Sequence, residues 1–153
     1  MKSNNALLLS AVAGCLFVAA PVAFAEAHAA PATNTAPAGL RVVYHVDDVG
    51  SLRKALNNIN NQLTATPNAN ISLLANGRGI FSLVSGERDR QGDFGSAIAE
   101  LQGKGVHFVA CGMSMKKNNV AASSLIANVA VVPSAVVELT RLQGAERYAY
   151  IKP

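Results

Sequence analysis

One cysteine and two methionines lie at alternating positions in the segment HFVACGMSM, residues 107 to 115. A cysteine thiolate is a nucleophile, and a thiolate with two thioethers is a ligand set that suits Cu(I). The same residue types also serve as packing, because free cysteine is often buried and methionine fills gaps between a helix and a sheet. The segment therefore has three interpretations: a reactive thiol at Cys111, a soft-metal site formed by Cys111, Met113 and Met115, or sulfur-rich packing.

The first 25 residues are typical of an export signal. Lys2 provides a basic start, residues 6–20 form an apolar run, and AFA at residues 23–25 supplies small residues before a cleavage site. An alternative is lipoprotein processing at Cys15. A permanent anchor is disfavoured, because the apolar run is shorter than the roughly 20 residues that a spanning helix needs. We therefore expect a periplasmic or secreted protein without stable membrane insertion after cleavage.

Removal of this signal would leave Cys111 as the only cysteine, since the chain has two and the other is Cys15. In an oxidising compartment a lone thiol is buried and inert, paired between chains, or reactive. Of the 13 Lys and Arg residues only Lys2 lies in the signal, so the mature chain would carry 12 basic and 9 acidic side chains. This mild excess gives no indication of nucleic acid binding.

The elements that would position the thiol begin at residue 40. Residues 26–39 are rich in Ala, Pro and Thr and are expected to form a flexible lead-in. In residues 40–153, short apolar runs alternate with helical periodicity. Strands are expected at 40–46, 71–75, 106–110, 128–132 and 147–151, helices at 51–63, 94–101, 116–127 and 134–143, and a charged solvent loop at 86–93.

This order of elements predicts one α/β domain, a three-layer sandwich with a mostly parallel five-stranded sheet flanked by helices. Asp48 or Ser51 can cap the first helix, and Ser134 is expected to cap the last one. In such a sheet, ligands and reactive groups gather beyond the carboxyl ends of the strands. This rule selects three sets of residues, which follow strands one, two and three: His45, Asp47 and Asp48; Asn76, Gly77, Arg78 and Gly79; and Cys111, Gly112, Met113, Ser114 and Met115.

Cys111 is expected where a strand passes into a helix, and the amide groups and dipole of that turn favour thiolate over thiol. Gly112 would let a partner approach the sulfur closely. His45 is a candidate base for this thiolate if strand one lies beside strand three, and otherwise a strand-end histidine without a chemical role. Arg78 is either a site for an anionic sulfur group or a simple exposed arginine. His107 lies inside a strand and is expected to be structural.

No paired-cysteine spacing, nucleophile elbow or HExxH helix is present, so neither a zinc site nor an ordinary hydrolase is supported. No cofactor is expected. Packing is favoured over metal binding for Met113 and Met115.

Several segments together resemble the DsrE/DsrF-like family in its exported, single-domain branch: VVYHVDD, LNNINNQL, GVHFVACGMSM, VVPSAVVELTRLQG and YAYIKP. The resemblance runs from Arg41 to Pro153. It implies a three-layer α/β domain, often assembled into trimers or hexamers, in a family linked to reduced sulfur. Members with sulfur-relay roles carry sulfur as a persulfide on a cysteine, and that role would fall to Cys111. Relatives often have His or Tyr where this chain has Asn76.

The favoured hypothesis is an exported sulfur carrier or sulfurtransferase-like protein that exchanges sulfur with small sulfur species or a partner thiol protein. The alternative is a non-catalytic oligomeric binding module, with a soft metal such as Cu(I) as a candidate ligand. For the first hypothesis Cys111 is the catalytic candidate. The candidates for binding are His45, Asn76, Gly77, Arg78, Gly112, Met113 and Ser114.

Overall fold

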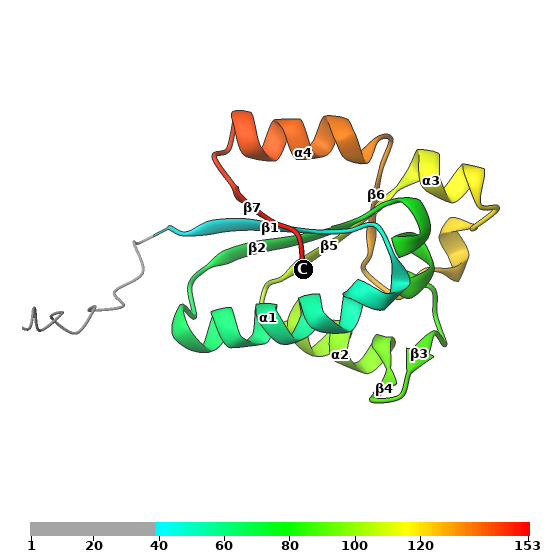
Figure 1. The fold of residues 1–153 in the computed structure, drawn as a ribbon, viewed down its shortest axis with the longest axis horizontal. Coiled ribbons are helices and arrows are strands. Elements are labelled where there is room, and N and C mark those ends of the chain that lie inside the picture. Colours follow the sequence, from blue (N-terminus) through cyan, green and yellow to red (C-terminus); the bar gives the residue numbers. More distant parts are fainter. Residues whose placement is uncertain (1–38) are drawn as a thin grey trace, which may run out of the picture. The chain divides into compact units, whose positions relative to one another are not determined.

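The computed structural model describes residues 39–153, which are built around a parallel β-sheet (Figure 1). The sheet has five strands, in the spatial order β6-β5-β2-β1-β7, and every neighbouring pair is parallel. The expected five-stranded sheet is confirmed and proves to be parallel throughout. The strands are β1 (Arg41–Val46), β2 (Asn70–Ala75), β5 (His107–Cys111), β6 (Ala130–Val132) and β7 (Ala149–Ile151).

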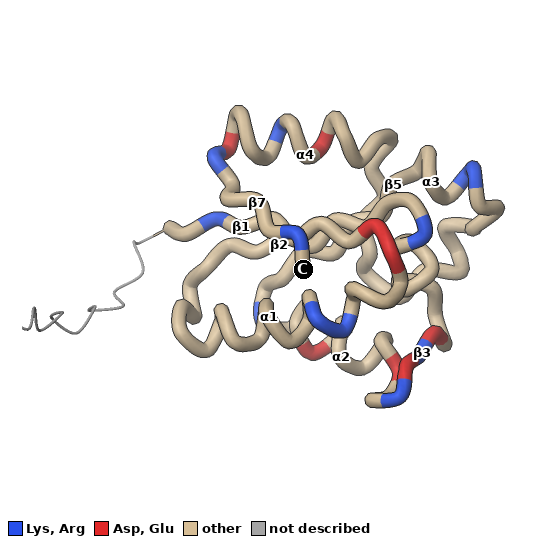
Figure 2. The backbone as a smooth tube through the Cα atoms, in the orientation of Figure 1, with Lys and Arg blue, Asp and Glu red and all other residues tan. Residues whose placement is uncertain are grey.

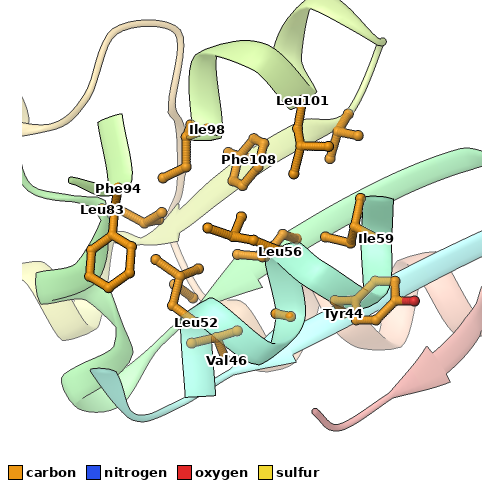
Figure 3. Packing of buried hydrophobic residues seen from close by; sticks show 14 of the residues in the cluster. Tyr44, Val46, Leu52, Leu56, Ile59, Leu83, Phe94, Ile98, Leu101 and Phe108 are labelled. Carbon is orange, nitrogen blue, oxygen red and sulfur yellow. The ribbon is translucent and has the colours of Figure 1, made fainter. Parts of the chain in front are cut away.

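Helices cover the two faces of the sheet unequally. Helices α1 (Leu52–Ala65) and α2 (Phe94–Gly103) lie on one face, and α4 (Ala135–Gly144) lies alone on the other (Figure 1). The apolar positions of α1 recur every three or four residues, and all of them are buried. Figure 3 shows them meeting side chains of the sheet and of α2, among them Leu52, Leu56, Ile59, Ile98 and Phe108.

The face under α4 has a smaller core, and Cys111 belongs to it. Successive residues of a strand point to opposite faces, so alternate positions of β1, β2 and β5 contribute to this core. The prediction of strands covered on both faces is therefore confirmed for β1, β2 and β5, whereas β6 and β7 are mostly exposed. The buried members are Val43, Leu74, Val109, Cys111, Ala135, Leu142 and Tyr148.

The helix expected at residues 116–127 is wrong. Helix α3 (Gly112–Lys117) starts directly after β5, and a separate 3-10 turn, η3 (Ala122–Ser124), follows it. Asn119 adopts a positive φ of 55°, a conformation that asparagine tolerates and that ends a helix. The strand therefore passes into α3 without an intervening loop.

Two further segments differ from the sequence expectations. A 3-10 helix, η2 (Gly77–Leu83), follows β2, and the expected loop at 86–93 contains the antiparallel hairpin of β3 (Arg88–Asp89) and β4 (Gly92–Asp93). Charges of both signs gather there (Figure 2). Arg53 fixes the hairpin to α1, because its Nε and Nη2 donate to the Asp89 carboxylate at 2.9 and 3.0 Å.

The proposed export signal at residues 1–25, the alternative processing site at Cys15 and nearly all of the lead-in at 26–39 lie outside the described residues. Within the described part of the chain, no helix has the length and apolar character needed to cross a membrane.

Candidate functional site

Cys111 is the last residue of β5 and the N-cap of α3, as expected for a thiol at the carboxyl end of a strand. Its side chain is buried, with 4% of the residue exposed. The sulfur accepts a hydrogen bond from the N–H of Ala135, the first residue of α4, at 3.3 Å. Ser134 is the N-cap residue of α4, as expected, but its side chain makes no capping hydrogen bond. At this helix start the sulfur of Cys111 accepts the N–H of Ala135 instead.

Two opposed effects act on the pKa of the Cys111 thiol. Burial raises the pKa, because it disfavours the charged thiolate. The polar groups of Ser114, Ala135 and Met113 around the sulfur outweigh burial, and among them the Ala135 N–H donates directly to the sulfur, at 3.3 Å. The pKa of Cys111 is therefore lower than the ordinary value for a thiol. A thiol of this kind is more readily converted to the nucleophilic thiolate.

Ser114 connects the cysteine turn to the turn that follows β2. Its Oγ accepts the N–H of Gly77 at 2.9 Å, although the two residues are 37 positions apart. The side-chain amide of Asn118 donates to the carbonyl oxygen of Ser114 at 2.7 Å. The carboxyl ends of β2 and β5 are therefore joined through Ser114.

His45 lies between Asn76 and Tyr150. Its Nε2 is 2.9 Å from Oδ1 of Asn76, and its Nδ1 is 2.7 Å from the hydroxyl oxygen of Tyr150. Because an amide oxygen only accepts, Nε2 carries a hydrogen. In the neutral ring Nδ1 then accepts the proton of the Tyr150 hydroxyl. His45 thereby links the carboxyl ends of β1, β2 and β7.

The condition for His45 to act as a base on Cys111 is not met. Strand β2 stands between β1 and β5, so strands one and three are not neighbours. His45 is aligned with Leu74, which is aligned with Val109, and two strand spacings separate the ends by roughly 10 Å. Both ring nitrogens of His45 are already engaged by Asn76 and Tyr150. His45 is therefore an anchor of the neighbouring strands.

The side chains of Cys111, Met113 and Met115 lie in three different environments. Met115 is 5% exposed and belongs to the larger core, on the opposite face of the sheet from the core that contains Cys111. Met113 is 68% exposed. Packing is confirmed for Met115 and is wrong for Met113. The proposed soft-metal ligand set of Cys111, Met113 and Met115 is not assembled in this fold.

Gly112 allows the start of α3 to lie close to the end of β6, because it has no side chain. A Cβ at Gly112 would lie 3.1 Å from the carbonyl oxygen of Val132, so the end of β6 occupies the space proposed for a partner.

Arg78 is exposed, and its guanidinium lies 5.6 Å from the ring centroid of Phe81. His107 is exposed at the amino end of β5, far along the strand from Cys111.

The sequence interpretation missed two contributors to this region, Ala135 and Tyr150. Ala135 acts through its backbone N–H, which residue type does not reveal. Tyr150 lies on the same sheet face as His45 because β7 pairs with β1, with Tyr150 aligned to Val43. Its placement would have followed from the sheet order, but composition and periodicity do not give that order.

The fold and this site define a three-layer α/β protein with a thiol of lowered pKa at the carboxyl end of a sheet strand. The sequence matches the DsrE/DsrF-like family over residues 27–153, and the chain belongs to that family.

Solved structures agree with the family assignment. A protein of unknown function from Methanobacterium thermoautotrophicum superimposes with a TM-score of 0.65 at 29% identity, covering 74% of this chain and 99% of that one. The ychN protein from E. coli superimposes with a TM-score of 0.61 at 14% identity, covering 73% and 99%, and supports the fold alone. No curated protein matches the chain.

Proposed function

We propose that the protein is an exported sulfur carrier that holds sulfane sulfur as a persulfide on Cys111. The observation that carries the proposal is the environment of the Cys111 sulfur, which accepts the N–H of Ala135 at the start of α4 at 3.3 Å and whose polar surroundings outweigh burial and lower the pKa of the thiol. Membership of the DsrE/DsrF-like family supports the same role. Export rests on the sequence of residues 1–25 alone.

The reaction is an exchange of one sulfur atom. The Cys111 thiolate attacks the outer sulfur of a donor persulfide or polysulfide, the donor sulfur–sulfur bond breaks, and the donor leaves as a thiolate. Cys111 then carries a persulfide. An acceptor thiolate attacks the outer sulfur, and Cys111 is released as the leaving thiolate. No external oxidant or reductant is required, because each step makes one sulfur–sulfur bond and breaks another.

Intact-mass measurement after exposure to polysulfide tests this proposal. The wild-type protein should gain the mass of one or more sulfur atoms and lose it on treatment with an excess of a small thiol. Cys111→Ala should gain nothing, whereas Met113→Leu should behave as wild type, because its exposed thioether cannot form a persulfide. An unmodified wild type, or an adduct that persists in Cys111→Ala, would refute the proposal.

Labelling of the native thiol tests access to the buried sulfur. A small alkylating reagent should modify Cys111 in the folded protein, at a rate above that expected from global unfolding. A thiol that reacts only after unfolding in denaturant would favour the alternative, a non-catalytic oligomeric binding module in which Cys111 serves as packing.

We also propose that the protein forms a homo-oligomer, since large apolar side chains remain exposed on α4 and the elements near it. Val136 and Val137 of α4 are each 68% exposed, Val131 of β6 is 46% exposed and Tyr150 of β7 is 42% exposed. Light scattering should give a mass of several chains for wild type and a lower one for Val136→Asp. Gln143→Asp places the same charge elsewhere on α4 and should leave the mass unchanged. A monomeric wild type would contradict the proposal.

A further inference from the structure

We propose that Tyr150 is a second nucleophilic site, at which His45 takes the phenol proton as general base and the phenol oxygen accepts an acyl group from a small activated ester. The site is separate from Cys111, because strands β2 and β1 lie between β5 and β7. Persulfide formation at Cys111 and acylation at Tyr150 can therefore succeed or fail independently.

The side chains of Tyr150 and His45 meet on one face of the sheet, at the carboxyl ends of β7 and β1. The hydroxyl oxygen of Tyr150 lies 2.7 Å from Nδ1 of His45, and the two ring centroids are 5.7 Å apart. Asp47 and Lys152, each two residues further along the chain, form an ion pair that ties the same two strand ends together. Tyr150 is thus held against His45 although it belongs to an outer strand of the sheet.

Asn76 orients the imidazole for this role. Its Oδ1 lies 2.9 Å from Nε2 of His45 and accepts the hydrogen on that nitrogen, which leaves a lone pair on Nδ1 for the Tyr150 hydroxyl. A nucleophile beside a base that is itself oriented by a third group is the arrangement that activates hydroxyl nucleophiles. When Nδ1 takes the phenol proton, the imidazolium keeps its hydrogen bond to Asn76.

The other two tyrosines of the chain show what distinguishes Tyr150. Tyr44 and Tyr148 are buried, and their hydroxyls donate to the amide oxygens of Gln62 and Asn70, at 2.8 and 2.9 Å. A buried hydroxyl requires such a partner, and an amide oxygen does not take up its proton. Tyr150 is 42% exposed, so water can satisfy its hydroxyl and burial does not require the imidazole. Its partner is nevertheless a base.

The position of Tyr150 leaves its hydroxyl open to a small reagent. Reactive groups of parallel sheets gather at the carboxyl ends of the strands, where this pair lies. Strand β7 is at the opposite edge of the sheet from β6, whereas α4 starts beside Cys111 of β5. Tyr150 is therefore set apart from Val136 and Val137, the most exposed apolar side chains of α4.

The reaction is an acyl transfer to the phenol oxygen. This oxygen attacks the carbonyl carbon of the ester, the bond from that carbon to the leaving oxygen breaks, and the leaving group departs as an aryloxide. The phenol proton passes to Nδ1 of His45 and from there to solvent. Tyr150 then carries the acyl group as an aryl ester, and no oxidant or reductant is involved.

Acetylation by p-nitrophenyl acetate tests the inference, with peptide mapping by mass spectrometry to separate Tyr150 from cysteine and lysine. Wild type should be acetylated at Tyr150. His45→Gln keeps a hydrogen-bond acceptor but has no base, and should slow this acetylation roughly a hundredfold, the lower end of the range for general base catalysis. Asn76→Asp still accepts the Nε2 hydrogen and should keep the rate within a few fold. His107→Gln changes an exposed histidine at the amino end of β5 and is the matched control.

Circular dichroism shows whether each variant is folded. A wild type that is not acetylated at Tyr150 would overturn the inference, and so would a folded His45→Gln protein that is acetylated there at the wild-type rate. Cys111→Ala should be acetylated at Tyr150 like wild type. Acetylation of Tyr150 in a protein that never acquires persulfide would support this inference and remove the proposed function.

Discussion

The close approach of η2 to the end of β1 makes Gly79→Ala the most informative substitution for the geometry of the site. A Cβ at Gly79 would lie 2.4 Å from the carbonyl oxygen of Val46, and 2.9 and 3.1 Å from the carbonyl carbons of Val46 and Asp47. Ordinary contact begins at 3.4 Å, so η2 and the strand end must separate by about 1 Å. All three neighbouring atoms belong to the backbone, and no flexible side chain can move aside.

We expect Gly79→Ala to lower the free energy of unfolding by about 3 kcal/mol, the upper end of the range for overpacking a close-packed interior. The entropic benefit of alanine over glycine is at most about 1 kcal/mol and does not offset this cost.

Urea unfolding followed by circular dichroism measures the change, with Gly103→Ala as the control. A Cβ at Gly103 meets nothing within 4 Å, and this residue ends α2. The control should be unchanged or more stable by up to about 1 kcal/mol. Superimposable curves for wild type and Gly79→Ala would refute the packing argument.

Three other outcomes are expected. The folded state favours the thiolate of Cys111, because the pKa of the folded thiol lies below its ordinary value. The free energy of unfolding of wild type, relative to Cys111→Ala, should therefore increase as pH rises from the lowered pKa toward the ordinary value, and should decrease again as pH falls. A difference that does not depend on pH would contradict this. Arg53→Ala should expose the β3–β4 hairpin to trypsin, while Lys54→Ala, which changes an exposed neighbour, should not. Ile98→Ala should cost about 2 to 5 kcal/mol in urea unfolding, because this side chain is fully buried in the larger core.

The sequence predicts the elements of this fold well where apolar periodicity decides them. The stripe of α1 and the continuous apolar runs of β1, β2 and β5 all have the burial that their patterns indicate. The failures occur where backbone conformation decides the structure. The end of α3 depends on the positive φ of Asn119, and η2 depends on Gly77 and Gly79 lying against the end of β1.

For the candidate site too, the sequence pattern predicts some features and not others. The position of Cys111 at the carboxyl end of a strand follows from pattern, because that end is where an apolar run meets a helix start. The partners of its sulfur do not follow, since Ala135 is 24 residues away and acts through its backbone. The interpretation of His45 as a base for Cys111 required two strands to be neighbours, and the sheet order that contradicts it depends on the pairing of whole strands.

Burial and reactivity at Cys111 act together in this structure. Removal of the thiol from water raises its pKa, but the same enclosure brings the start of α4 within hydrogen-bonding reach of the sulfur, and Cys111 is itself the N-cap of α3. These N–H groups carry partial positive charge, which stabilises a thiolate more strongly in a poorly solvated site than in water. An apolar core that merely contained a cysteine would have the first effect alone and would raise the pKa. The lowered pKa of Cys111 therefore supports the proposed sulfur carrier over simple packing at this position.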